Sequence, residues 1–259
     1  MSLVLWEVGG QIGTITLNHY EKRNALSRAL IIELIQALNA LLLEEVRVIV
    51  IRAQAGAKVW SAGHDVTELE RPGRDPLGYY DPLEQVIRAI QTCPVPVLAL
   101  IEGSVWGGAC ELAFVCDILI GTPHTSFTIT PARIGIPYNP SGILHLINLC
   151  GLGAAKEMFF TAQPVAAERA LRLGILNHVV SAAEIDTFTY DLARTIAKNS
   201  PLSISVIKEQ IHILANALPI SAETFERIQG LRRLVWDSED YLEGKQAFLE
   251  KRPPVFQGR

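Results

Sequence analysis

Short apolar runs alternate with segments of helical periodicity through the first half of the chain, and this alternation constrains the fold more than any other feature of the sequence. Residues 46–51, 97–101 and 118–121 are rich in Val, Ile and Leu, as expected of strands buried on both faces of a sheet. Residues 83–91 and 107–116 fall between consecutive runs and have the apolar spacing of helices. Strand, helix and strand in this order predict a parallel α/β sheet with right-handed crossovers.

The two ends of the chain depart from this alternation. Residues 4–8 and 12–17 flank a pair of glycines, which predicts a β-hairpin ahead of the parallel sheet. Ser27 follows as the expected N-cap of a helix. From residue 141 onward nearly every segment has helical periodicity, so an α/β part is followed by a helical part.

The composition excludes several classes of protein. With 49% hydrophobic and 19% charged residues among 259, the chain is too apolar to be intrinsically disordered. A formal net charge of −4 gives no electrostatic footprint for nucleic acid or an anionic membrane. No apolar stretch reaches the ~20 uninterrupted residues of a membrane span, and the first residues lack the pattern of a signal peptide. The mean hydropathy of +0.24 predicts a very full core or surface buried between subunits.

The four cysteines and six histidines show no spacing typical of a metal site. There is no Cys-x-x-Cys pair and no HExxH or HxH motif. In a chain of this size we expect the cysteines to be buried, reduced thiols, as in a cytoplasmic protein. The sequence therefore predicts no metal and a cytoplasmic location.

Two segments share a plan in which a strand leads into a glycine-containing turn. They span residues 59–65 and 101–111, and the second opens onto a helix that begins near Gly108. Glycine lets the backbone approach a ligand closely and lets successive N–H groups point at one oxygen, which is how an oxyanion hole is built. Glycine turns are also common packing features, so the residues alone leave both interpretations open. Neither segment has the Gly-x-Gly-x-x-Gly pattern of a dinucleotide site.

Five segments, in order along the chain, carry a family resemblance. They are NAL at residues 24–26, SAGHD at 61–65, EGSVWGGACE at 102–111, GIP at 135–137 and ALRLGILNHVV at 170–180. Together they resemble the enoyl-CoA hydratase/isomerase family, also called the crotonase family, over nearly the whole chain.

The resemblance implies both a fold and an assembly. Residues 1–195 are expected to form a crotonase-like superhelix of ββα units, an α/β architecture, and residues 196–259 a C-terminal helical trimerisation region. A homo-oligomer is implied, either a trimer or a hexamer built as a dimer of trimers. The implied substrate is an acyl-CoA thioester. Coenzyme A is then part of the substrate, and no separate cofactor is expected.

The same resemblance places the thioester oxygen between the backbone N–H groups of His64 and Gly108. Hydratases of the family are similar at Glu111, but they carry a second glutamate at the position where this chain has Pro131. The missing carboxylate removes half of the acid–base pair that hydration requires. Thr130 and Tyr138 offer neutral hydroxyl groups instead, which suits a substrate that carries its own carboxylate.

Two further segments, GRDPL at residues 73–77 and FERIQG at 225–230, resemble the family members that decarboxylate malonyl-type thioesters. The sequence therefore predicts decarboxylation of methylmalonyl-CoA or malonyl-CoA to propionyl-CoA or acetyl-CoA, through an enolate held in the oxyanion hole. The alternative is an enoyl-CoA hydratase or isomerase in which Glu111 is the sole carboxylate. A CoA-binding scaffold without activity is a distant third interpretation.

The predicted site residues have different expected roles. His64 acts through its backbone, Tyr138 or a bound water supplies a proton to the enolate, and Asp65 caps its loop. Glu111 is an orienting group, a proton relay or a hydrogen-bonded structural group. The residues expected to be catalytic are His64, Gly108, Glu111, Thr130 and Tyr138, and those expected to contact the substrate or its CoA moiety are Lys22, Arg23, Ala62, Gly63, His64, Asp65, Val66, Gly108, Thr130 and Lys251. For the three cations in this list the alternative is a solvated surface charge.

Overall fold

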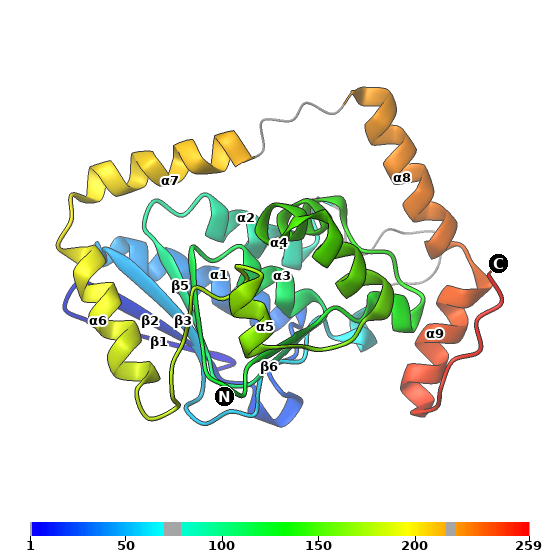
Figure 1. Ribbon diagram of the computed structural model, residues 1–259, viewed down its shortest axis with the longest axis horizontal. Helices are drawn as coiled ribbons and strands as arrows, with labels where there is room; N and C mark the ends of the chain where they lie inside the picture. Colours follow the sequence, from blue (N-terminus) through cyan, green and yellow to red (C-terminus); the bar gives the residue numbers. More distant parts are fainter. Residues whose placement is uncertain (1, 70–78, 216–220, 259) are drawn as a thin grey trace.

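The computed structural model describes residues 2–69, 79–215 and 221–258, so the GRDPL segment at residues 73–77 lies outside the described residues (Figure 1). The strands are β1 Val4–Gly9, β2 Ile12–Leu17, β3 Val48–Ala53, β4 Val59–Ser61, β5 Val97–Ile101, β6 Ser104–Trp106, β7 Ile118–Gly121, β8 Ser126–Thr128, β9 Val165–Ala166 and β10 His178–Val179. They form a six-stranded sheet in the order β1-β2-β3-β5-β7-β10 and a four-stranded sheet in the order β4-β6-β8-β9. The larger sheet starts with the antiparallel pair β1 and β2 and is parallel from β2 through β10.

Helices connect and cover these strands. The α-helices are α1 Arg28–Leu43, α2 Pro82–Gln91, α3 Gly108–Phe114, α4 Pro140–Thr161, α5 Ala167–Arg172, α6 Ile185–Ala197, α7 Pro201–Ala215, α8 Ala222–Trp236 and α9 Glu239–Glu250. Three short 3-10 helices occur in connections, η1 Tyr20–Lys22, η2 Val66–Glu68 and η3 Pro131–Ile134.

The central strands β3 and β5 of the larger sheet are buried on both faces. One face belongs to the main core, which also contains the apolar side chains of α1, α2 and α3. The other face is covered by α6, whose Ile185 packs in a second core (Figure 1). Neighbouring residues of β3 alternate between the two, since Ile49 lies in the main core and Val50 in the second. This two-sided burial explains why the parallel strands are continuous apolar runs.

The predicted elements of the first half are present, with shifted ends. The N-terminal hairpin is confirmed as β1 paired with β2, and Ser27 caps α1 by accepting a hydrogen bond from the Leu30 N–H at 3.3 Å. The bounds predicted for the strand at residues 46–51 are wrong by two residues, because the Arg47 N–H donates to the hairpin turn and the parallel ladder begins at Val48. The helix predicted at residues 107–116 is the shorter α3.

The sequence does not predict the smaller sheet. Its strands β4, β6 and β8 have three residues each, which is too short for a period of two to be visible. They form because they pair in parallel beneath the two glycine turns. This sheet therefore decides where those turns lie relative to each other.

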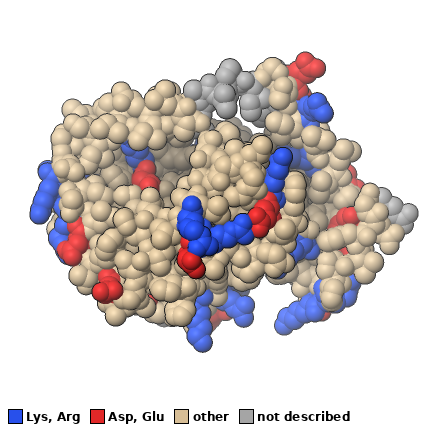
Figure 2. Space-filling model, viewed as in Figure 1, with Lys and Arg blue, Asp and Glu red and all other residues tan. Residues whose placement is uncertain are grey.

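The C-terminal helices extend away from the sheets (Figure 1). α7 runs along one side of the core and has no buried residue, and α9 packs against η3. Figure 2 shows that the side of α7 that faces the viewer is almost without charged atoms. The exposed large apolar side chains of α7 are Leu202, Val206, Ile207, Ile211, Ile213 and Leu214.

Among the described residues, α4 is the helix long and apolar enough to cross a membrane by length and composition. Its most apolar window has a mean hydropathy of 1.3. Gly151 interrupts it with φ 78° and ψ 162°, so α4 is two helical segments joined at a kink. A bilayer offers no partners for the backbone groups freed at such a break, and we interpret α4 as a surface helix pair.

Candidate active site

A cavity of about 1200 Å³ lies between the two glycine turns, η3 and the end of α9. Its walls come from segments that are far apart in the sequence. Every predicted site residue except Gly63 lines it. Those residues are Lys22, Arg23, Ala62, His64, Asp65, Val66, Gly108, Glu111, Thr130, Tyr138 and Lys251.

Parallel pairing of β4 with β6 brings the two glycine turns together. Gly63 has φ 86°, and a β-carbon there would overlap the carbonyl oxygen of Trp106 and lie 3.2 Å from the Gly108 nitrogen. The His64 nitrogen lies 3.7 Å from the position of a β-carbon on Gly108. Gly108 is the first residue of α3, so its N–H has no partner within the helix. Gly63 does not line the cavity itself, but its missing side chain lets the backbone N–H groups of His64 and Gly108 lie close together.

The Thr130 hydroxyl lies beside the same turn. A β-carbon on Gly107 would be 3.2 Å from Thr130 Oγ1, and the Gly107 N–H donates to the Thr128 carbonyl at 2.8 Å. Pro131 follows as the first residue of η3 and also lines the cavity. This part of the wall therefore has a neutral hydroxyl group and a proline, with no carboxylate at residue 131.

Tyr138 and Glu111 also line the cavity. Burial raises the pKa of the Tyr138 phenol well above its usual range, and the neighbouring Glu111 raises it further. The phenol therefore keeps its proton at any physiological pH. Glu111 is 2% exposed and lies among the side chains of Asn139, Ser141 and His145.

Glu84 is a second buried carboxyl group that the sequence analysis missed. It is on α2, 9% exposed, and its side chain accepts a hydrogen bond from the Asn139 amide. Burial and the charge of Glu111 raise the pKa of Glu84 to about 7. The sequence carried one signal that Glu84 would be buried. It lies three residues before Ile87, on the apolar face of α2.

The Asp65 carboxylate caps η2, as predicted. It accepts hydrogen bonds from the Thr67 N–H at 3.0 Å and the Thr67 hydroxyl at 2.6 Å, and Lys22 Nζ lies 3.7 Å away. Burial works to raise the pKa of Asp65, but these hydrogen bonds and the lysine charge lower it overall.

Basic residues gather where the cavity opens. Lys22 and Arg23 follow one another around η1, and Lys251 caps α9 in the left-handed conformation with φ 56°. The neighbouring Arg252 is held by Glu243 at 2.6 Å. Among the described residues, no group of three or more His, Cys, Asp or Glu side chains is placed to hold a metal ion.

The paired glycine turns bring two backbone N–H groups to one cavity, which makes it a candidate oxyanion site, and comparison with known proteins gives the family. The enoyl-CoA hydratase/isomerase family profile matches residues 7–259, and the chain belongs to this family. The predicted family and its α/β fold are thereby confirmed.

Individual relatives are more specific. The chain is 49% identical to methylmalonyl-CoA decarboxylase of Escherichia coli (strain K12) over 248 residues, which cover 96% of this chain and 95% of the relative. It is 29% identical to the short-chain-enoyl-CoA hydratase of Clostridium acetobutylicum, over 96% and 95% of the two chains. A solved structure of methylmalonyl-CoA decarboxylase in complex with 2-nitronate-propionyl-CoA matches with a TM-score of 0.97 at 47% identity, covering 99% of both chains. Another, complexed with 2S-carboxypropyl CoA, matches with a TM-score of 0.98 at 47% identity, covering 100% and 99%.

Proposed function

We propose that this protein decarboxylates methylmalonyl-CoA to propionyl-CoA, with malonyl-CoA as the analogous smaller substrate. The observation that carries this proposal is the cavity wall at Thr130 and Pro131, which has a neutral hydroxyl group beside the glycine turns where a hydratase is expected to have a carboxylate. A carboxylate at that point would repel the substrate's own carboxylate. The relative at 49% identity, a methylmalonyl-CoA decarboxylase, supports the same assignment.

The proposed mechanism uses backbone groups to stabilise charge. The thioester carbonyl lies between the N–H groups of His64 and Gly108, and Thr130 holds the departing carboxylate out of the thioester plane. The bond between the α-carbon and the carboxylate breaks, CO₂ leaves, and the electron pair enters the enolate. Losing one preorganised donor to such an oxyanion typically costs ~3–4 kcal/mol of barrier.

The enolate then needs a proton on its α-carbon. Tyr138, or a water molecule that it holds, delivers that proton in this mechanism. Burial keeps the phenol protonated, which supports its role as a donor. The reaction needs no separate cofactor, because the thioester itself accepts the electron pair.

The CoA moiety is proposed to lie at the basic mouth of the cavity. Lys22, Arg23 and Lys251 meet its phosphates, while Ala62, Gly63, Asp65 and Val66 form the loop that follows the acyl chain and pantetheine. Lys22 supports this proposal, since it lines the cavity, its side chain is 61% exposed and its Nζ lies 3.7 Å from Asp65.

We further propose a homo-oligomer, a trimer or a dimer of trimers, in the cytoplasm. The exposed apolar side chains of α7 support it, because isolated domains rarely expose so many large apolar side chains on one helix. We also propose a division into a catalytic core of residues 1–195 and an assembly region of residues 196–259; the nearest break between helices, residues 198–200 between α6 and α7, lies just after this boundary.

Incubation with two substrates tests the function. We expect CO₂ release from methylmalonyl-CoA and no hydration of crotonyl-CoA. Prompt hydration of crotonyl-CoA without CO₂ release from methylmalonyl-CoA would instead support the alternative, an enoyl-CoA hydratase or isomerase that uses Glu111.

A further inference from the structure

Glu84 and Glu111 flank the same amide and the same hydroxyl group. The Asn139 amide donates to Glu84 Oε1, and its nitrogen lies 3.5 Å from Glu111 Oε2. Ser141 Oγ lies 3.5 Å from Glu84 Oε2 and 3.5 Å from Glu111 Oε1. Two carboxyl groups buried this closely cannot both ionise without a large repulsion, so one proton is favoured between them.

Two arginines and one further carboxyl group also act on the charge of Glu84. Arg88 is the cation on α2, with its guanidinium 3.9 Å from Glu84 Oε2, and Arg232 on α8 acts in the same direction. Asp81 at the start of α2 opposes them, and its own pKa is raised by burial. These charges and the burial together account for a Glu84 pKa of about 7.

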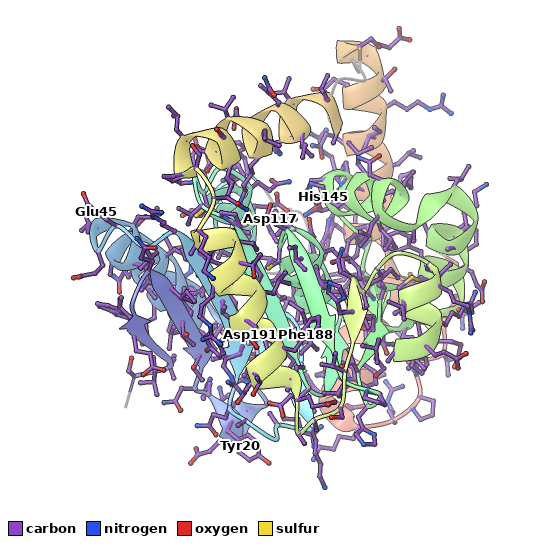
Figure 3. The ribbon with its side chains drawn as sticks, turned by 60° about the vertical axis from the view of Figure 1, so that its left-hand side comes forward. Tyr20, Glu45, Asp117, His145, Phe188 and Asp191 are labelled. Carbon is purple, nitrogen blue, oxygen red and sulfur yellow. The ribbon has the colours of Figure 1, made fainter. Side chains whose placement is uncertain are left out.

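His145 lies between the pair and a second cavity. Its Nδ1 is buried, lies 3.7 Å from Glu111 Oε1 and has no hydrogen-bond partner among the described residues. Its Nε2 lies 2.7 Å from the Gln91 amide nitrogen. His145 also lines a second cavity of about 610 Å³, which lies beneath α7. Asp117 lines the same cavity, and both residues are labelled in Figure 3. Glu111 lines the first cavity, which we call the acyl cavity because the proposed function places the acyl group there. Glu111 and His145 therefore connect the acyl cavity with the second cavity.

We propose that Glu84 and Glu111 share one proton at neutral pH, that Glu111 passes it into the acyl cavity in each turnover, and that His145 returns a proton from the second cavity. This inference rests on the proposed decarboxylation, which consumes one proton per turnover. The bond to the carboxylate breaks, CO₂ leaves, and the electron pair forms a bond with the proton that comes from Glu111 directly or through the Tyr138 hydroxyl. Solvent in the second cavity supplies the replacement proton through His145.

Glu84 does not line the acyl cavity and is a positioning residue that acts through Glu111. Its like charge is what keeps a proton on the pair at neutral pH. Arg88 acts in the opposite sense, because its positive charge stabilises the ionised pair. Removing the two side chains one at a time must therefore move the titration of the pair in opposite directions.

The test is the pH profile of kcat for CO₂ release in Glu84→Gln and Arg88→Gln. In the wild type we expect kcat to fall above about pH 7, where the pair loses its proton. Glu84→Gln should move this fall to lower pH by at least about one unit, which lowers kcat at pH 7.5 about tenfold with little change in KM. Arg88→Gln should move the fall of kcat to higher pH.

Glu44→Gln is the matched control and should leave the profile unchanged, because Glu44 is an exposed glutamate after α1 that does not line the cavity.

A uniform loss of kcat in Glu84→Gln without any shift of the profile, or shifts of both variants in the same direction, would overturn the proposal. A second measurement separates this outcome from failure of the proposed function. In ligand-free protein, the infrared C=O band of a buried protonated carboxyl group should disappear with a midpoint near pH 7 and be absent at that pH in Glu84→Gln. If the wild type releases no CO₂ but shows this band, the proposed function is wrong and the proposal of a shared proton is retained. If no such band titrates, the proposal of a shared proton is wrong.

Discussion

Gly142 lies directly against the ring of Tyr138. A β-carbon at residue 142 would overlap Cε1 of that ring and would lie 2.6 Å from Glu111 Oε2. The missing side chain is therefore what allows the phenol and the carboxyl group to sit on the same side of the acyl cavity. Asn139 at the N-cap position of α4 and Ser141 in its first turn each have a side-chain atom 3.5 Å from the Glu111 carboxyl group.

Gly142→Ala should displace Tyr138 and Glu111 and lower kcat for decarboxylation by about 100-fold, the usual effect of misplacing a catalytic group by about 1 Å. The control is Gly153→Ala on the same helix, where a β-carbon would meet nothing within 4 Å. Steady-state kinetics together with circular dichroism of both variants make the comparison. Equal activity of the two variants would show that the close packing at Gly142 has no role in turnover.

Tyr138→Phe should lose far more turnover than His64→Ala. The phenylalanine removes the hydroxyl group to which the proposed mechanism assigns proton delivery, and a positioned acid is typically worth about 100-fold or more. Alanine at residue 64 keeps the backbone N–H, which is the group assigned to the oxyanion hole. Measurement of kcat for both variants decides the matter, and comparable losses would assign a catalytic part to the imidazole.

Lys251→Asn should raise KM for the acyl-CoA about fivefold and leave kcat nearly unchanged, because it removes about 1 kcal/mol of attraction to the CoA phosphates. Asparagine tolerates the left-handed backbone at this residue, so the end of α9 is preserved. Lys156→Asn, at an exposed lysine on α4 that does not line the cavity, is the control. The difference in KM should shrink at high ionic strength, and a KM independent of both salt and substitution would contradict the assignment.

Asp65→Ala should destabilise the protein by about 1 kcal/mol at pH 7, the usual cost of a lost cap. The pKa of Asp65 is lower in the folded protein than its ordinary value of about 4. Its stabilising contribution is therefore complete above that ordinary value and is lost as the pH falls through the lower, folded value. Urea unfolding of wild type and variant at pH 7 and pH 3 should show the difference between them shrinking in acid. A difference that grows in acid would mean that the sign is wrong.

Ile213→Asp should prevent assembly, because it places a charge among the exposed apolar side chains of α7, at a side chain that is 56% exposed in the single chain and does not line the second cavity. Light scattering after gel filtration should report a trimer or hexamer for the wild type and a smaller species for the variant. Ser203→Asp, on an exposed residue of the same helix with a polar side chain, is the control. A monomeric wild type would contradict the proposed assembly.

The sequence by itself determines the layered α/β architecture and the family. The apolar runs that become β3, β5 and β7 are typical of strands in a parallel sheet covered on both faces, and the glycines at residues 63 and 108 mark the two turns. These signals are local, because each depends on residue types within a few positions of one another. These local signals mark the two glycine turns, whereas the other predicted residues of the cavity wall, such as Thr130, Tyr138 and Lys251, come from the family resemblance.

Only the tertiary structure decides which side chains meet across elements. The three-residue strands β4 and β6 place His64 beside Gly108, although they are too short to be predicted from periodicity. Glu84 meets Glu111 because α2 and α3 pack together and turn two carboxyl groups toward the same amide of Asn139. Such contacts depend on the rotation of each helix about its axis and on the packing of its neighbours, and no spacing along the chain encodes them. The proposed shared proton is for this reason a property of the folded protein.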